Sequence, residues 1–283
     1  MTDDLDLERE ASRTAVGVAV HRAAHLLLDD PPPILNDTIA LRLLGPGGTE
    51  LVAHLSDRLR SPYALAFRSH LVLRSRYAED VLAESAAAGV GQFVSLGAGM
   101  DTFAYRQPAW AGSLRLFEVD HPASQAAKIE RLAAAEVPIP PNLAFVPVDL
   151  DVDGLGDALE RAGFDRARPA VVASLGVLMY LRPETVGSIF DFVAGLAPGS
   201  RFAFTFARPA IPGRDRLAEA AARHGEPWLT RFTPEALVGE LRRHGLTDVE
   251  LLEPERAQER YFAARTDGLH APSRVNLAVA TAG

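Results

Sequence analysis

The chain contains no cysteine among its 283 residues. Disulfides, thiolate zinc sites and a cysteine nucleophile are therefore excluded, and a cytoplasmic location is the simplest expectation. No apolar run approaches the roughly 18 residues that a membrane-spanning helix needs. The first ten residues, MTDDLDLERE, are acidic, whereas a secretory signal starts with basic residues and an apolar segment. We therefore expect neither membrane insertion nor secretion.

Clusters of lysine and arginine are also missing, and the formal net charge is −8. A chain of this charge is not expected to attract nucleic acid. Its composition is otherwise that of an ordinary globular protein, with 48% hydrophobic and 23% charged residues. That apolar share is enough to build a sizeable core.

The first 88 residues show helical periodicity only. We expect helices over residues 8–28, 36–44 and 49–59, and a longer one from Ser61-Pro62 to about Ala88. The triple proline that follows the first helix would end it, because proline cannot continue a helical hydrogen-bond ladder.

From Gly91 onward, strand and helix patterns alternate, which is typical of a mostly parallel, doubly wound α/β sheet. The expected strands lie near residues 92–96, 114–118, 143–147, 170–175, 200–206, 246–251 and 274–280. A helical insert is expected near residues 208–240. We expect one structural domain, with residues 1–88 as a helical cap and residues 89–283 as the core.

The stretch QFVSLGAGMDTFAYR covers residues 92–106. Its apolar start predicts a buried strand, Gly97, Ala98 and Gly99 predict a tight turn, and a helix is expected to open at Asp101. This order brings a cofactor close to bare backbone at the end of the strand. The third glycine of the GxGxxG fingerprint is missing, which disfavours a dinucleotide but leaves an NAD(P)-dependent oxidoreductase as an alternative. The acid in the turn suits a sulfonium or ammonium ligand such as S-adenosylmethionine.

The next expected strand ends in two carboxylates, Glu118 and Asp120. Asp120 follows Gly99 by 21 positions, close to the spacing of roughly 20 residues at which an acid accepts hydrogen bonds from ribose hydroxyls. The alternative is an acid that caps the end of its strand. Together with the glycine turn, this acid favours a cofactor that contains a nucleoside.

Four stretches in order, LGAGMDTFAYR, FEVDHPASQAAKIERL, FVPVDL and LGVLMYL, resemble successive motifs of the leucine carboxyl methyltransferase family. Within that family the chain is most similar to bacterial small-molecule methyltransferases that use S-adenosyl-L-methionine. The resemblance runs from about Arg13 to about Leu269. It implies the class I methyltransferase fold, a Rossmann-like sheet of seven strands with the last one antiparallel, and an N-terminal helical lid.

The resemblance also implies roles for individual residues. Asp149 and Leu150, which end FVPVDL, would bind the adenine, although Asp149 could instead cap a helix. Arg13, Arg74 and Arg76 are the candidates for the methionine carboxylate, because the guanidinium fork matches a planar carboxylate.

Tyr180, within LMYL, would face the transferred methyl group, and a half-buried aromatic without a role is the alternative. Leu175 stands where many family members have a glutamate that holds the methionine amino group. That group would need another partner here, such as the Gly97 carbonyl. His21 and His25 share a helix face but have no third ligand beside them, so we expect surface or lid residues and no metal.

The expected activity is O-methyl transfer from S-adenosyl-L-methionine to a small-molecule acceptor. A carboxylate acceptor needs no base, whereas a hydroxyl acceptor does, and the sequence suggests none. Carboxyl methylation is therefore the first expectation, and hydroxyl methylation in secondary metabolism the second. A non-catalytic cofactor-binding protein is the alternative from another class. The protein is expected to be a monomer or a homodimer.

Overall fold

The computed structural model describes residues 16–210, 216–223 and 225–283. One seven-stranded sheet, in the order β3-β2-β1-β4-β5-β7-β6, forms its centre. The strands are β1 (Gln92–Leu96), β2 (Arg115–Asp120), β3 (Leu143–Pro147), β4 (Ala170–Ser174), β5 (Arg201–Thr205), β6 (Asp248–Leu251) and β7 (Leu277–Thr281). Strands β1 to β5 run parallel, and β7 is antiparallel to both β5 and β6. The predicted doubly wound sheet is confirmed.

The helices and short turns that connect the strands complete the core. In chain order they are η1 (Phe103–Tyr105), η2 (Ala109–Ser113), α6 (Pro122–Ala134), α7 (Leu155–Arg161), η3 (Leu178–Tyr180), α8 (Pro183–Ala194), α9 (Arg216–Arg223), α10 (Pro234–Arg243), α11 (Pro254–Ala257) and η4 (Gln258–Phe262). The insert expected between the fifth and sixth strands contains α9 and the start of α10. No helix in the described part of the chain is both long and apolar enough to cross a bilayer.

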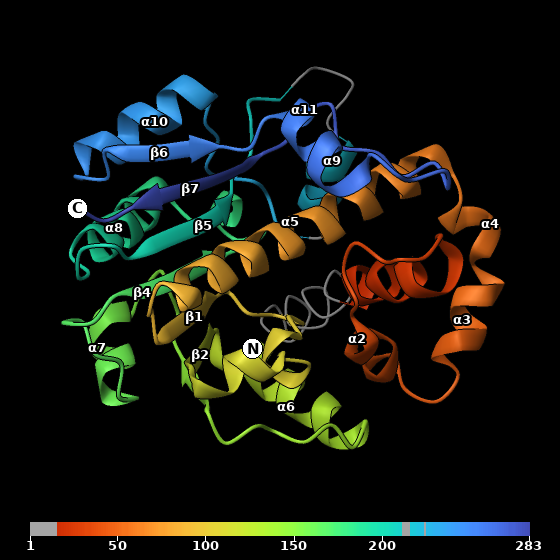
Figure 1. Ribbon diagram of the computed structural model, residues 1–283, viewed down its shortest axis with the longest axis horizontal. Coiled ribbons are helices and arrows are strands. Elements are labelled where there is room, and N and C mark those ends of the chain that lie inside the picture. The colour runs from red at the N-terminus through yellow and green to blue at the C-terminus, as the bar shows by residue number, and fades with distance from the viewer. Residues whose placement is uncertain (1–15, 211–215, 224) are drawn as a thin grey trace.

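Successive side chains of a strand point to opposite faces of the sheet. In these strands both sets of side chains are mostly apolar, so both faces of the sheet are buried. Phe93 belongs to the core on one face and Val94 to the core on the other. Ala203 lies between Phe202 and Phe204 in the same alternating way. Helices α7, α8 and α10 cover one face, while α5 (Pro62–Ala87), η1 and α11 cover the other. Figure 1 shows α5 crossing in front of the sheet.

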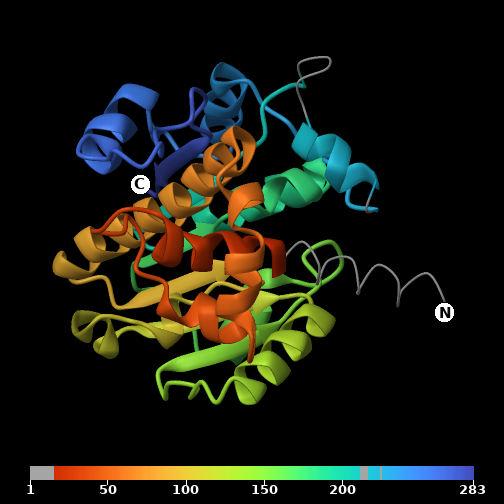
Figure 2. The same ribbon diagram turned by 90° about the vertical axis from the view of Figure 1, so that its right-hand side faces the viewer.

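Shorter helices precede α5. Residues 16–28 are helical and are followed by α2 (Thr38–Leu43), α3 (Gly48–His54) and α4 (Ser56–Leu59). The single helix expected over residues 49–59 is wrong, because Leu55 takes φ −90° and ψ 3° and separates α3 from α4. The expected start of α5 is confirmed, with Ser61 Oγ accepting a hydrogen bond from Ala64 N and proline following it. Figures 1 and 2 show these N-terminal helices at the edge where the parallel strands end.

A buried network of charges attaches these helices to the core. The Arg22 side chain lies 3.2 Å from the Asp37 carboxylate, which also lies 3.5 Å from Arg106. Arg106 pairs in turn with Glu79 on α5. Arg22 also donates a hydrogen bond to the carbonyl of Met100, in the loop after β1. Two arginines and two carboxylates compensate one another, which buried charges require.

Of the two expectations for His25, a surface or a lid residue, the structure contradicts the surface one. Its side chain is buried, with Nδ1 2.8 Å from Asp29 Oδ2, and its Nε2 accepts a hydrogen bond of 2.9 Å from Ile34 N. It is therefore not a surface residue, and its place on the helix of residues 16–28 leaves it within the predicted lid segment. His21 stacks edge-on against Phe67, and burial lowers its pKa to about 4. A ring that is uncharged at neutral pH fits this apolar contact.

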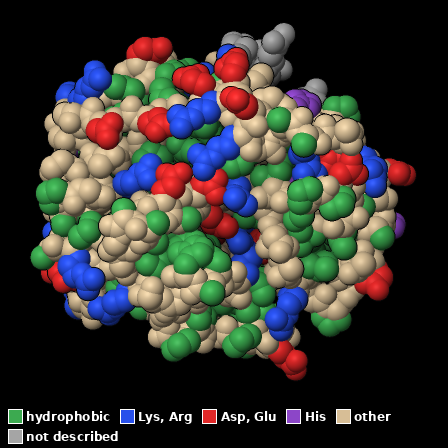
Figure 3. Space-filling model, viewed as in Figure 1, with side chains coloured by type: hydrophobic (Ala, Val, Ile, Leu, Met, Phe, Trp, Pro, Cys, Tyr) green, Lys and Arg blue, Asp and Glu red, His purple; other side chains and the backbone are tan. Residues whose placement is uncertain are grey.

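The outer face of the protein carries interspersed charges. Figure 3 shows acidic and basic side chains lying next to one another on the face that carries α5 and α11. Part of this surface consists of ion pairs, among them Arg76 with Asp80 and Arg260 with both Asp80 and Glu84. Exposed pairs of this kind contribute little to stability, about 1 kcal/mol or less each.

Candidate functional site

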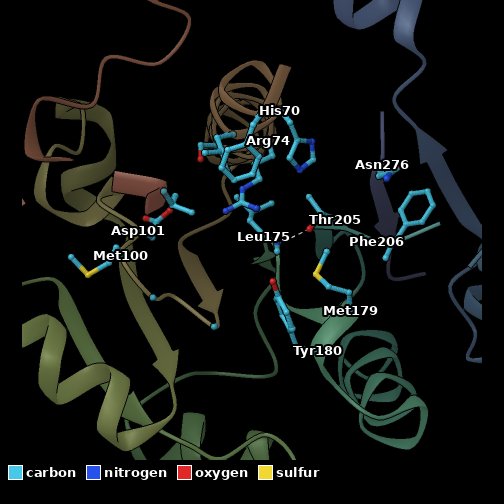
Figure 4. Close-up of a pocket in the computed structure, with 18 of the residues that line it drawn as sticks. His70, Arg74, Met100, Asp101, Leu175, Met179, Tyr180, Thr205, Phe206 and Asn276 are labelled. Carbon is cyan, nitrogen blue, oxygen red and sulfur yellow. Dashed lines mark hydrogen bonds between the residues drawn. The ribbon is translucent and has the colours of Figure 1, made fainter. Parts of the chain in front are cut away.

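A cavity of about 490 Å³ lies at the ends of β1, β4 and β5. Its walls come from the helix of residues 16–28, α5, the glycine turn after β1, the segments that follow β4 and β5, and the segment before β7. Figure 4 shows how side chains from these separate elements converge. Open α/β sheets bind their ligands at this edge, outside the carboxyl ends of the strands.

The glycine turn forms one wall of the cavity with Gly97, Ala98 and Gly99. Gly97 has φ 62°, a conformation that costs a residue with a Cβ atom energy. A Cβ at this position would also lie 2.9 Å from Cγ1 of Val177 and still closer to its Cγ2. Only glycine therefore lets the turn pass the segment after β4 this closely.

The loop after this turn differs from the expectation of a helix that opens at Asp101. Only the short 3-10 turn Phe103–Tyr105 forms there. Asp101 Oδ1 accepts a hydrogen bond of 2.8 Å from Phe103 N, which is local capping of a tight turn. Asp101 remains part of the cavity wall. A polar loop, and not a helix end, thus borders the cavity here.

Asp120, at the end of β2, closes the glycine turn. Its carboxylate accepts hydrogen bonds from Gly99 N and, at 2.8 Å, from His121 N. Burial raises the pKa of Asp120, and the two backbone donors oppose that effect. The acid therefore lies directly beside the turn, but it is not part of the cavity wall.

Arg74 projects from α5 into the middle of the cavity (Figure 4). No hydrogen bond or ion pair to Arg74 occurs among the described residues. Burial, and then the charge of Arg22, lower the pKa of Arg74 to about 10, while Tyr180 and Asp101 act in the opposite direction. A Cβ on Gly176 would lie 2.5 Å from the guanidinium, so that glycine makes room for it. Arg74 is thus a half-buried cation without an anionic partner in contact among the described residues.

Arg76 and Arg13 are the other two arginines proposed to bind the methionine carboxylate. Arg76 lies outside the cavity, its side chain is 47% exposed, and it pairs with Asp80 at 2.8 Å. Arg13 lies outside the described residues. Arg22, which the sequence did not single out, does line the cavity. Nothing in its local sequence distinguishes it from other helical arginines.

Tyr180 and Leu175 line the cavity beside Arg74. The Tyr180 hydroxyl stays protonated well into the alkaline range because burial raises its pKa, an effect that the Trp228 indole opposes. The backbone of segment 228–230 is hydrogen-bonded to the turn that contains Tyr180. Leu229 N and Thr230 N both donate to the Met179 carbonyl, at 2.7 and 3.2 Å. The segment after α9 is thereby held against the end of β4.

Asp149, Leu150 and Glu118 do not line this cavity. Asp149 Oδ1 accepts a 3.0 Å hydrogen bond from Asp151 N within a turn, and the next helix begins only at Leu155. The alternative of a helix cap at Asp149 is therefore wrong. Leu150 packs against the core on the face that α7 and α8 cover.

Glu118 has protein partners of its own. It is 4% exposed, pairs with Lys128 Nζ at 2.7 Å and accepts a 3.0 Å hydrogen bond from the Tyr105 hydroxyl. Burial raises its pKa, and Lys128 opposes the rise. The acid thus connects β2 to α6 and to the loop after the glycine turn.

Three further cavity residues escaped sequence reasoning: His70 on α5, Thr205 at the end of β5 and Asn276 before β7. Burial, and then Arg74, lower the pKa of His70 to about 3. Thr205 Oγ1 accepts a 2.6 Å hydrogen bond from Gly176 N. These residues come from distant segments, so no local motif could have grouped them.

Comparisons of the sequence with known proteins identify the family of this chain. The model of the leucine carboxyl methyltransferase family matches residues 15–194. A Bacillus subtilis (strain 168) protein, provisionally named S-adenosyl-L-methionine-dependent methyltransferase YktD, is 35% identical over 206 residues, which are 70% of this chain and 67% of its own. A Mycolicibacterium gilvum (strain PYR-GCK) protein with the same provisional name is 34% identical over 259 residues, 88% of this chain and 78% of its own.

Two solved structures share the fold. A DUF574 family protein from Streptomyces avermitilis superposes with a TM-score of 0.55 at 20% identity, covering 85% of this chain and 94% of its own. A Thermobifida fusca protein, provisionally described as a methyltransferase, gives 0.53 at 23% identity, covering 85% and 90%. The family match and the two sequence relatives show that this chain belongs to the leucine carboxyl methyltransferase family and is an S-adenosyl-L-methionine-dependent methyltransferase.

Proposed function

We propose that the enzyme methylates a carboxylate oxygen of a small molecule. The observation that carries this proposal is the protonation state of two cavity side chains suited to proton transfer. His70, with a pKa lowered to about 3, is a weak base, and the raised pKa of Tyr180 keeps its hydroxyl protonated. A carboxylate acceptor needs neither group, because it is already a nucleophile at neutral pH.

The cavity offers a matching pair of charges for the amino-acid end of the cofactor. Arg74 would bind the methionine carboxylate, and Asp101, together with the Gly97 carbonyl, would receive the ammonium group. Arg74 and Asp101 both line the cavity, and Figure 4 shows Arg74 near its middle and Asp101 at one side. Such an arrangement would compensate for Leu175, at the position where the family resemblance implies a glutamate. Asp120 would hold the ribose hydroxyls, and Asp149 with Leu150 the adenine.

S-adenosyl-L-methionine supplies a methyl group on a positively charged sulfur. The protein's own contribution is to align the acceptor oxygen with that methyl group at about 3 Å and to exclude water. Leu175, Met179 and Phe206 provide apolar walls for this purpose. Charges of opposite sign cancel as the carboxylate attacks, so a dry cavity favours the step.

Two measurements test the proposal. Titration calorimetry should show binding of S-adenosylmethionine and S-adenosylhomocysteine but not of NAD. Turnover assays with a panel of carboxylic acids and the matching alcohols should then yield methyl esters and no ethers. The oxidoreductase and the non-catalytic binder that the sequence left open no longer apply, since the family assignment makes the chain a methyltransferase.

We expect the pH dependence of turnover to separate carboxylate from hydroxyl acceptors, the latter being the second candidate because His70 reaches the cavity. A carboxylate has a pKa near 4, and neither His70 nor Tyr180 changes protonation between about pH 6 and 9. The single-turnover rate at saturating cofactor should be flat over that range. A rate that rises tenfold per pH unit would contradict the carboxylate and indicate a hydroxyl that must lose its proton.

Asp120→Ala should weaken S-adenosylhomocysteine binding about tenfold to a hundredfold, since a carboxylate that accepts two hydroxyl hydrogen bonds contributes about 1.5–3 kcal/mol. Asp120→Asn keeps an acceptor for Gly99 N and should lose less. Asp149→Ala is the comparison, with a milder loss. Calorimetry gives all three affinities. An unchanged affinity in Asp120→Ala would exclude the ribose role.

We also propose that residues 1–88 act as a lid that is ordered by the cofactor. Helices α2, α3 and α4 have six, seven and four residues, too short to be stable without a surface to pack on. In hydrogen exchange, residues 16–60 should gain protection when S-adenosylhomocysteine is added, while the core strands change little. Equal protection with and without the ligand would make this segment a permanently docked cap.

A further inference from the structure

The cavity has two distinct ends. In Figure 4, Met100 and Asp101 lie on one side, Thr205, Phe206 and Asn276 lie on the other, and Arg74 stands between them. The proposed function assigns the first end and Arg74 to the cofactor. The second end, formed by the segments after β4 and β5 and before β7, is therefore the place for the methyl acceptor. The side chains at this end should therefore indicate which chemical class of acceptor binds there.

Aromatic side chains gather around this cavity. Phenylalanine, tryptophan and tyrosine make up only 7% of the chain, yet five of them line the wall: Tyr63, Phe67, Tyr180, Phe206 and Trp228. The Met179 thioether adds a polarizable contact. Such walls favour flat, unsaturated molecules, because ring pairs gain energy beyond simple burial and sulfur packs well on rings.

Two polar groups at this end lack protein partners. His70 makes no hydrogen bond within the described part of the chain, and its ring is neutral. The Asn276 side chain also lines the cavity, and it makes no hydrogen bond among the described residues. The backbone holds Asn276 in place, since its carbonyl accepts a 3.2 Å hydrogen bond from Phe206 N. The His70 ring and the Asn276 amide both carry N–H groups, so a ligand with an acceptor group can receive hydrogen bonds from them.

We propose that this end of the cavity binds a planar aromatic carboxylic acid, whose ring packs against Phe206 and Trp228 and whose carboxylate is held by His70 and the Asn276 amide. The inference rests on the proposed function. A neutral imidazole carries one N–H donor, and the amide carries two. Because neither partner is a cation, the carboxylate keeps its electron density for attack. A lone pair of its oxygen forms the new O–C bond, the C–S bond breaks with its electron pair on sulfur, and no proton moves.

Binding of small probes to the protein saturated with S-adenosylhomocysteine tests this assignment by ligand-observed NMR. Benzoate should bind about three- to tenfold more tightly than cyclohexanecarboxylate, which has the same charge and a similar size but no π face. His70→Phe preserves ring packing and removes the nitrogen atoms, and Asn276→Leu preserves volume without the amide. Each should weaken benzoate binding about fivefold or more, with S-adenosylhomocysteine affinity unchanged within about twofold.

Two control variants complete the design. His54→Phe makes the same replacement on an exposed part of α3. Arg274→Gln removes an exposed arginine of the cavity wall that could attract carboxylates by charge alone. Neither should change the preference for benzoate. A loss in Arg274→Gln equal to that in His70→Phe would overturn the assignment to His70.

The remaining outcomes separate this inference from the proposed function. Equal binding of the aromatic and saturated acids, or no benzoate binding at about 10 mM, overturns the aromatic site and leaves carboxyl methylation standing. An unchanged affinity in both His70→Phe and Asn276→Leu overturns their role. Tighter binding of benzyl alcohol than of benzoate overturns the carboxylate acceptor and, with it, the proposed function.

Discussion

Arg74→Met should weaken binding of S-adenosylhomocysteine by about thirtyfold to several thousandfold. Truncating one partner of a buried, hydrogen-bonded charge pair costs about 2–5 kcal/mol, because the other charge is left without compensation. The methionine carboxylate would be that charge, since Arg74 has no anionic partner of its own in contact among the described residues. Titration calorimetry at neutral pH measures the loss directly.

The same variant should not reduce the stability of the free protein. Burial and the nearby charge of Arg22 lower the pKa of Arg74 to about 10, so Arg74 stays charged at neutral pH but the folded state carries that charge at a cost in free energy. A volume-conserving apolar side chain removes that penalty. Thermal denaturation without ligand should give an unchanged or raised midpoint, and added S-adenosylhomocysteine should raise the midpoint less than in the parent.

Arg76→Met is the matched control. Arg76 lies on the same helix two positions later, but its side chain is 47% exposed and pairs with Asp80. Cofactor affinity should change less than about threefold, because an exposed ion pair contributes about 1 kcal/mol or less and lies outside the cavity. Equal losses in both variants would contradict the assignment of the carboxylate to Arg74.

Gly97→Ala should destabilise the protein by about 2–5 kcal/mol. The left-handed backbone at φ 62° costs an alanine about 1–2 kcal/mol. Its Cβ would collide with the stiff, β-branched side chain of Val177, and such overpacking adds about 1–3 kcal/mol. Urea unfolding should show a lower midpoint with an unchanged slope. Cofactor affinity should fall as well, because the turn forms the cavity wall.

Gly89→Ala separates the two causes. Gly89 has φ 95°, and a Cβ there would meet nothing within 4 Å, so only the backbone cost applies. Its destabilisation should be clearly smaller than that of Gly97→Ala. Adding Val177→Ala to Gly97→Ala should recover part of the lost stability, since it removes both colliding methyl groups. A double variant no more stable than Gly97→Ala would show that the contact with Val177 does not matter.

Periodicity accounts for most of what could be predicted about the fold. The switch from helical to alternating patterns at Gly91 located the sheet, and short apolar runs located its strands to within three residues at each end. Ser61 and Pro62 marked the start of α5 because their cap chemistry is local. Two predictions of helices were wrong, the single helix across Leu55 and the helix opening at Asp101. Neither the bend at Leu55 nor the turn at Asp101 has a proline, glycine pair or other breaking signal that would predict it.

The site was less predictable because several of its residues belong to helices. Arg74 and Arg76 are two positions apart, and successive helical residues are rotated by about 100°, so the two side chains leave α5 in very different directions. Which direction meets the cavity depends on how α5 packs on the sheet. Glu118 illustrates the same limit, because its partner Lys128 lies on another element, α6.

The sequence by itself determined the class of sheet, the glycine turn with Asp120 beside it, and the family. These features rest on local propensity, on periodicity and on contiguous motifs. Tertiary structure alone decided that Arg74 and not Arg76 enters the cavity, that His25 is buried, and that His70 and Asn276 share one wall. Distances between remote segments follow from packing and strand order, which no stretch of neighbouring residues encodes.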